Sequence, residues 1–131
     1  MSGAAAAVQA ALVAALRSGL GGQVTGVFDG VPADAVLPYA TIGEVVTSGW
    51  GAKGLDGREH RVAVMLWDEA GRVTQLHTLM AAAEGAIGGM ATALPGHQIV
   101  GLLFLRARVV RDGVRPWAGL VEFRVRTVPV G

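Results

Sequence analysis

The residues that could bind a metal or act as nucleophiles are few and scattered in this chain of 131 residues. Its three histidines are isolated, and no two of them have a metal-ligand spacing such as HxxxH; they are His60, His77 and His97. The chain has no cysteine, which excludes disulfides, thiolate catalysis and zinc–thiolate sites. We therefore expect the histidines to be structural or surface residues, and we predict no metal ligands.

Nucleophilic and acid–base catalysis lack their usual arrangements as well. None of the serines, at positions 2, 18 and 48, lies in a GxSxG motif. Glu84, on a predicted helix, has no second carboxylate three or four residues away, so a carboxylate pair would have to come from distant segments. We predict no catalytic residues and expect that the protein is not an enzyme.

A glycine pattern at Gly49, Gly51 and Gly54 matches the GxGxxG spelling of dinucleotide-binding loops. Such a loop needs a helix directly after it, because the helix N-terminus binds the pyrophosphate. Residues 58–67 alternate in a strand pattern instead. No nucleotide or other cofactor is therefore predicted.

The segment around these glycines, Thr47–Gly57, contains four glycines in eleven residues and predicts a long, mobile hairpin tip. It carries the candidate partner-contact residues Trp50, Lys53 and Leu55. Two interpretations remain open. The apolar side chains either fold back on the body of the protein or stay exposed for a partner.

The most regular pattern lies in Ile99–Thr127, which predicts two long strands, 99–110 and 117–127, joined through Asp112-Gly113. Asp-Gly between two apolar runs is typical of a β-hairpin. The odd-numbered positions of both strands are almost all apolar and predict a dry face. The other face is mixed and rich in arginine; its candidate contact residues are Arg106, Arg108, Glu122, Arg124 and Arg126.

This arginine-rich face has two interpretations. The guanidinium groups could bind phosphates or an acidic partner. Alternatively, the face is solvated and its charges form cross-strand pairs, for instance through Glu122. The net charge of only +1 favours the second interpretation.

The remaining elements follow from hydrophobic periodicity. Apolar residues recur every three or four positions in Ala4–Ser18 and from Val73 to Ile87, which predicts two amphipathic helices. Residues 58–67 are apolar on both faces, so this strand is central or its second face is covered by another subunit. The strands predicted before the second helix are Val24–Asp29, Tyr39–Val46 and Arg58–Trp67.

The order helix, strand, strand, strand, helix, strand, strand, with short connections, predicts an α+β fold. Its sheet is expected to be mainly antiparallel with about five strands, and both helices are expected to pack on one face. No internal repeat or change of composition divides the chain, so residues 1–131 are predicted to form a single domain.

Composition excludes several classes of protein. Hydrophobic residues make up 52% of the chain and charged residues 16%, which excludes disorder. The apolar run Ala4–Leu16 has no positive charge before it, so the charge order does not fit a signal peptide, and the run is too short to span a bilayer. No membrane association is predicted.

Several short strings carry a resemblance to a known family. They are Val27-Phe28-Asp29, Val31-Pro32, Leu37–Glu44, the strand end Val64–Trp67 with the helix start at Gly71, and the closing arginine-rich strand pair. Over nearly its whole length the chain resembles the small tail-completion proteins of long-tailed phages and gene transfer agents. These proteins are also called tail terminators or tail-to-head joining proteins.

The resemblance implies a structural virion assembly protein without catalytic residues or cofactors. Such proteins form a six-fold ring on the last ring of the tail tube, stop its polymerisation and offer a surface to the head-side connector or stopper protein. The expected partners are further copies of the chain, the tube protein and the connector, while DNA passes through the ring without specific binding. The expected location is the bacterial cytoplasm during assembly, and then the head–tail junction of a phage or gene transfer agent particle.

A closed ring needs two complementary patches on each subunit. Strand edges and the two-sided apolar strand Arg58–Trp67 are the candidates for these patches. From the residues alone two other classes stay open. One is a small ligand-binding or enzymatic α+β domain, and the other is a nucleic-acid-binding module that uses the arginine-rich face.

Overall fold

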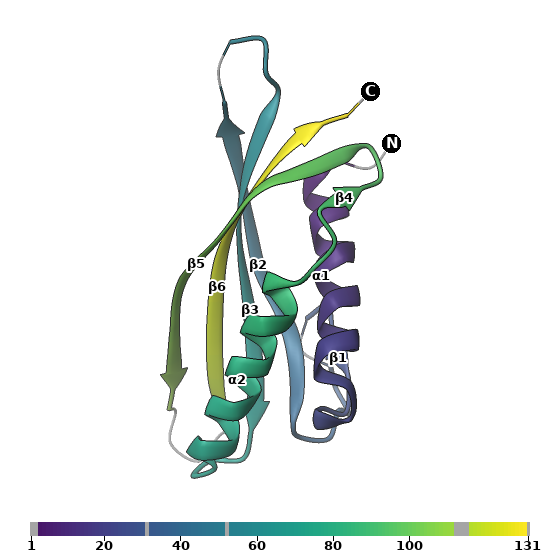
Figure 1. Ribbon diagram of the computed structural model, residues 1–131. Coiled ribbons are helices and arrows are strands. Elements are labelled where there is room, and N and C mark those ends of the chain that lie inside the picture. Colours follow the sequence, from purple (N-terminus) through teal and green to yellow (C-terminus); the bar gives the residue numbers. More distant parts are fainter. Residues whose placement is uncertain (1–2, 31, 52, 112–115, 131) are drawn as a thin grey trace.

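The computed structural model describes residues 3–30, 32–51, 53–111 and 116–130. The helices are α1 (Ala4–Leu20), a short 3-10 helix η1 (Gly21–Gln23) and α2 (Val73–Gly88). The strands are β1 (Val27–Phe28), β2 (Tyr39–Trp50), β3 (Gly57–Asp68), β4 (Ala93–Leu94), β5 (His97–Val110) and β6 (Trp117–Pro129). The two α-helices lie on the same face of one sheet (Figure 1).

Within the described residues the sheet has six strands in the order β1-β2-β3-β6-β5-β4. The long strands β2, β3, β6 and β5 are each antiparallel to their neighbours, whereas β1 runs parallel to β2. Strand β3 is central, as its two apolar faces predict. The predicted α+β class is confirmed, but the predicted five strands and their order need correction, because β4 adds a strand after α2. This strand pairs over two residues only, too few to show a period in the sequence.

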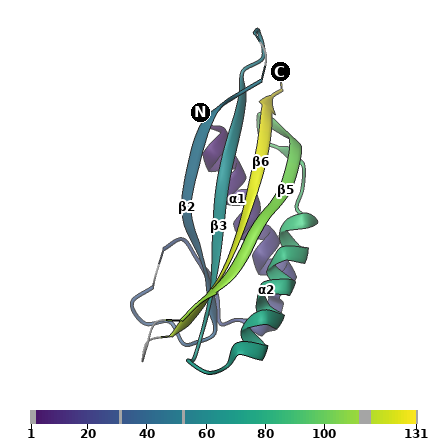
Figure 2. The same ribbon diagram turned by 90° about the vertical axis from the view of Figure 1, so that its left-hand side faces the viewer.

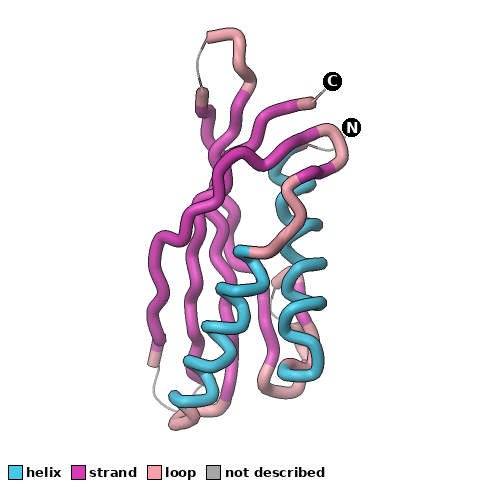
Figure 3. Tube along the Cα trace, viewed as in Figure 1, coloured by secondary structure: helices cyan, strands magenta, loops and turns pink. Residues whose placement is uncertain are grey.

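The strands β2 and β3 extend further than predicted and form a projecting arm. The sequence predicts a loop from Thr47 onward, but the ladder continues to the pair Trp50–Gly57. The turn that remains contains Gly51 and Gly54, which both have positive φ, a conformation that glycine adopts without steric cost. The arm reaches beyond the rest of the sheet (Figures 1 and 3). Pairing with a neighbouring strand thus outweighs the low strand propensity of the glycines. The predicted turn at Asp112-Gly113 lies outside the described residues.

Register shifts interrupt the alternation of β5. They occur between Ile99 and Gly101 and between Phe104 and Arg106, and each extra residue moves the following side chains to the other face. The predicted uninterrupted dry face of this strand is therefore wrong: Leu103 is 46% exposed, while Leu102 packs against the core. Strand β6 has no such shift against β3 and keeps its predicted buried face.

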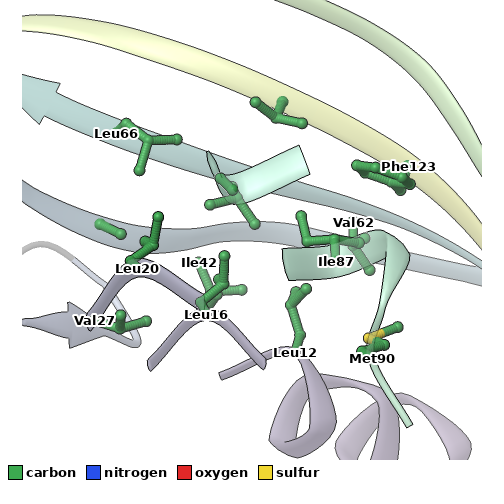
Figure 4. Close-up of a cluster of buried hydrophobic side chains, with 14 of the residues drawn as sticks. Leu12, Leu16, Leu20, Val27, Ile42, Val62, Leu66, Ile87, Met90 and Phe123 are labelled. Atoms are coloured by element: carbon green, nitrogen blue, oxygen red, sulfur yellow. The ribbon is translucent and has the colours of Figure 1, made fainter. Parts of the chain in front are cut away.

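The core lies between the helices and one face of the sheet (Figure 4). The predicted apolar stripe of α1 is fully buried and extends by one turn, through Val8, Leu12, Leu16 and Leu20. The buried side chains of α2 are Leu76, Leu79, Met80, Ala83 and Ile87. They meet inward-facing residues of the sheet, including Ile42, Val62, Val64, Leu66, Val121 and Phe123.

By length and composition alone, Ala4–Gln23 suits a membrane-spanning helix, whereas the apolar run Ala4–Leu16 is too short for one. Much of its apolar character comes from alanine. Its large apolar side chains are buried against the sheet and α2. In this structure α1 is therefore a core helix.

Small residues let the helices and the sheet approach closely. A Cβ at Gly19 of α1 would collide with the Cβ of Ala86 on α2. A Cβ at Gly119 of β6 would lie 2.5 Å from Cγ and Sδ of Met80. The two helices and the sheet are therefore in contact at positions where no methyl group fits.

We predict opposite effects of two glycine substitutions. Gly19→Ala is expected to lower the free energy of unfolding by about 1–3 kcal/mol, because the new methyl group must push α1 and α2 apart. Gly85→Ala, in α2 with open space at its Cβ, is expected to raise it by about 0.5–1 kcal/mol through helix propensity. Urea denaturation of both variants measures this, and equal effects of the same sign would contradict the close helix contact.

A histidine interrupts the apolar inner face. His60 of β3 is completely buried, with Nδ1 2.9 Å from the hydroxyl of Thr47 and Nε2 3.0 Å from the hydroxyl of Thr127. Burial lowers the pKa of His60 below its ordinary value of 6.5, and His97 and Arg58 act in the same direction. The imidazole is thus a neutral link between β2, β3 and β6, as expected for a structural histidine.

The lowered pKa makes stability depend on pH. The unfolded chain protonates His60 near pH 6.5, whereas the folded chain resists protonation, so the free energy of unfolding is expected to fall as the pH drops below that value. His60→Gln keeps a polar side chain but does not titrate. Its loss of stability between pH 7 and pH 5 is expected to be smaller than that of the wild type in urea denaturation. His77→Gln, on the exposed side of α2, controls for the removal of a histidine. If the free energy of unfolding changes equally with pH in the wild type and in His60→Gln, His60 is not the source of the pH dependence.

Candidate interaction surface

No described helix covers the face of the sheet opposite α1 and α2 (Figure 2), although Tyr39 and Thr41 of β2 are buried on it. We call it the outer face. Residues opposite each other in the ladder form rows across it: Glu59 pairs with Arg126, Arg61 with Arg124, and Ala63 with Glu122. Because side chains two positions apart share a face of a strand, β3, β6 and β5 each contribute more than one charged group to this surface.

A cluster around Arg126 lies on the outer face next to the base of the arm. Its Nε donates a hydrogen bond of 3.0 Å to Oε1 of Glu59, and its guanidinium lies 4.9 Å from the centre of the Trp50 ring. Nε of Arg124 is 3.8 Å from the same Glu59 oxygen. The indole lies over Gly57, whose missing side chain makes room for the ring. One glutamate and one tryptophan therefore hold two arginines in place.

A second pair lies towards β5. Arg106 Nε donates a hydrogen bond of 2.9 Å to Glu122 Oε1, and the two residues are directly opposite in the ladder. This is the cross-strand pairing through Glu122 expected if the charges of this face pair with one another. Arg108 is exposed further along β5. On β3, β5 and β6 the arginines of this face outnumber its glutamates, so a positive charge remains there; they are Arg61, Arg106, Arg108, Arg124 and Arg126 against Glu59 and Glu122.

The structure separates the three candidate residues of the loop. Trp50 is the last residue of β2, and its ring is half-buried beneath Arg126. Lys53 and Leu55 lie in the exposed turn at the tip of the arm, where Leu55 is 43% exposed. Trp50 therefore folds back on the outer face, while the tip residues remain accessible. Whether they contact a partner stays a prediction.

The contact between Trp50 and Arg126 connects the candidate contact loop with the arginine-rich face, which are far apart in the sequence. Sequence reasoning missed Glu59 and Arg61, which complete the charged cluster. The run of charged residues Arg58–Arg61 is visible in the sequence. Its contact with Arg124 and Arg126 could not be predicted without knowing that β3 lies between β2 and β6.

A metal site or a pocket would be a different kind of functional site. Among the described residues no group of three His, Cys, Asp or Glu side chains could hold a metal ion. A hollow of about 620 Å³ lies at the start of α1 and is lined in part by Asp56, Arg58 and His97. Asp56 and Arg58 form an ion pair with each other.

Large apolar side chains are also exposed near two strands of the sheet. Val100, Leu103 and Phe104 lie on β5, and Val46 lies on β2. Each of these four side chains is at least 41% exposed. Apolar surface of this kind is typical of contact regions between proteins.

Comparisons with known proteins identify a family and two proteins of similar structure. A family model described as tail completion protein gp17 matches residues 5–128. A chain from the virion of a native gene transfer agent particle has a similar structure, with a TM-score of 0.78 and 26% sequence identity over 97% of this chain and 99% of that chain. The gp17 protein of bacteriophage SPP1 has a similar fold, with a TM-score of 0.62 and 19% identity over 98% of this chain and 91% of that chain. The comparison with curated proteins gives no match.

The Glu59 cluster generates a testable prediction. Glu59→Gln removes the charge that faces Arg124 and Arg126, and we expect the free energy of unfolding to fall by up to about 1 kcal/mol at low salt. Because salt screens the remaining repulsion between the arginines, the effect is expected to shrink at 0.5 M NaCl, roughly five times the ionic strength at which the screening length is 10 Å. Glu69→Gln, in the exposed turn after β3, is the control. A salt-independent loss would contradict the electrostatic role of Glu59.

Proposed function

Because this chain belongs to the tail completion protein gp17 family, a family of structural phage proteins and not of enzymes, we propose that it is a tail terminator. In this role it closes the tail tube as a ring of six copies and joins the tube to the head-side connector or stopper protein. The observation that carries the proposal is the family match over nearly the whole chain. The similar chain in a gene transfer agent virion supports a phage-like particle as the setting.

A ring of identical subunits needs a heterologous interface, in which one patch meets a different patch of the next copy. The fold offers such patches, because the two sides of its sheet end in different strands. The proposed partners are therefore further copies of the chain, the tube protein and the connector. DNA passes through the ring without specific binding. Assembly takes place in the bacterial cytoplasm, and the finished ring lies at the head–tail junction.

We assign the contact with the tube to the β2–β3 arm. The arm projects from the body of the protein (Figure 1) and has the exposed side chains Lys53 and Leu55 at its tip. Its base is held by the cluster of Trp50, Arg126 and Glu59. An exposed tip on a fixed base can bind a neighbouring ring without rearrangement of the core.

The alternative classes are less well supported. Family membership shows that the chain is not an enzyme. A nucleic-acid-binding module would use free guanidinium groups, but Arg106 and Arg126 already bind Glu122 and Glu59. Each ion pair reduces the number of counterions that phosphate binding could release.

Trimming the arm tests the proposal. Replacement of residues 51–56 by an Asn-Gly turn, which suits a two-residue hairpin, is expected to leave the melting temperature within a few degrees of the wild type. The same variant is expected to abolish the formation of joined, DNA-filled particles when it replaces the wild-type gene. Particle counts by electron microscopy and thermal melting measure the two effects.

Val36→Ser provides a matched control, because Val36 is 70% exposed but lies outside the arm, in the loop before β2. We expect this variant to assemble normally. A trimmed protein that folds and still yields particles at the wild-type level would overturn the role of the arm.

A further inference from the structure

Two strands of the sheet have open edges, one on each side. Strand β1 pairs only with Ala40 and Thr41 of β2, so the described residues from Ile42 to Trp50 have no strand partner on that side. Strand β4 pairs only with His97 and Gln98 of β5. The described residues Val100–Val110 therefore have no strand partner on the side away from β6. In Figure 2 these edges lie on opposite sides of the sheet. Open edges present unpaired N–H and C=O groups that can bind a further strand.

Exposed apolar side chains lie near both edges. Val100, Leu103 and Phe104 on β5 are 50%, 46% and 41% exposed, and Val46 on β2 is 51% exposed. A long edge strand with exposed apolar side chains promotes aggregation unless another strand covers it. The surface of the isolated chain is therefore incomplete on both sides of the sheet.

We propose that the open edge of β5 pairs with the open edge of β2 in a second copy of the chain, so that one sheet continues from subunit to subunit. This inference deepens the proposed ring and rests on it. Strands β2, β3, β6 and β5 alternate in direction, so β5 is antiparallel to β2. A rotation about an axis along the strands preserves their directions, and β5 of one copy then meets β2 of the next in an antiparallel arrangement.

The ladder of the single chain gives the register of this contact. Val46 pairs with Arg61, Arg61 with Arg124, and Arg124 with Leu103, so one row crosses the outer face from edge to edge. If the rows continue without a shift, Val46 of one copy lies opposite Leu103 of its neighbour. Two of the most exposed apolar side chains would then cover each other.

Charge supports the same pairing. The only charged residue of β2 is Glu44, and the arginines of β5 are Arg106 and Arg108. Gly43 and Glu44 form the register shift opposite Ala63, whose row continues through Glu122 to Arg106. Pairing of β5 with a second β5 would instead bring the arginines of two copies into one interface without an added carboxylate.

The absence of cysteine makes the register testable by disulfide cross-linking. The double variant Val46→Cys/Leu103→Cys replaces the wild-type chain in assembled particles, which are then oxidised and run on a non-reducing gel. Residues directly opposite in an antiparallel ladder have Cα atoms about 4.5–5.5 Å apart, within reach of a disulfide. We expect a ladder of covalent multimers. Val46→Cys/Val110→Cys is the matched control, because Val110 lies about 20 Å further along β5.

A ladder that only the first double variant forms supports the proposal. Dimers from Leu103→Cys alone would show pairing of β5 with β5 and overturn it. Normal particles without cross-links would also overturn it while leaving the proposed function intact. Cross-linked multimers of the purified protein that fail to cap tubes would support the edge contact and contradict the proposed function.

Hydrogen exchange of the wild-type protein gives an answer even where the cysteine variants do not assemble. Backbone amides of β5 that point away from β6 are expected to exchange at least about tenfold more slowly in the particle than in the free chain. Equal exchange rates in both states would overturn the proposal.

Discussion

The structure depends on one constraint: helices α1 and α2 cover one face of the sheet, so the main apolar core lies on that face. The central strand β3 shows the consequence in adjacent residues. His60 points inward, is fully buried and is linked to two threonine hydroxyls, whereas Glu59 points outward and binds Arg126. A side-chain period of two brings charge and core to opposite sides of the same strand. Close contacts at Gly19 and Gly119 hold the layers together.

The sheet also has unpaired strand edges on both sides. The helices cover the middle of the sheet, and the flanking strands β1 and β4 contribute two residues each. Register shifts in β2 and β5 redirect side chains there, so that Leu103 reaches the outer surface. Apolar side chains and unpaired backbone therefore occur together at both edges. In a protein whose family acts in tail completion, these edges are suited to contact with neighbouring subunits.

Several features of the fold could be predicted because they depend on local periodicity. The stripes of α1 and α2, the alternation of β6 and the central place of β3 follow from the spacing of apolar residues. The pairing of Arg106 with Glu122 could be anticipated because a single hairpin contains both residues. The positions of the register shifts could not, since an extra residue in one strand changes no composition or period that a short window can detect.

By itself the sequence determined which side chains share a face of a strand or helix, and it held no arrangement of residues suited to catalysis. The tertiary structure decided which strands are neighbours. Glu59 and Arg126 are 67 positions apart and meet only because β6 folds back beside β3. The physical reason is that a period of two is common to all strands, so it specifies the face of a side chain but not the strand beside it. The Trp50–Arg126 cluster and the two open edges follow from that choice of neighbours.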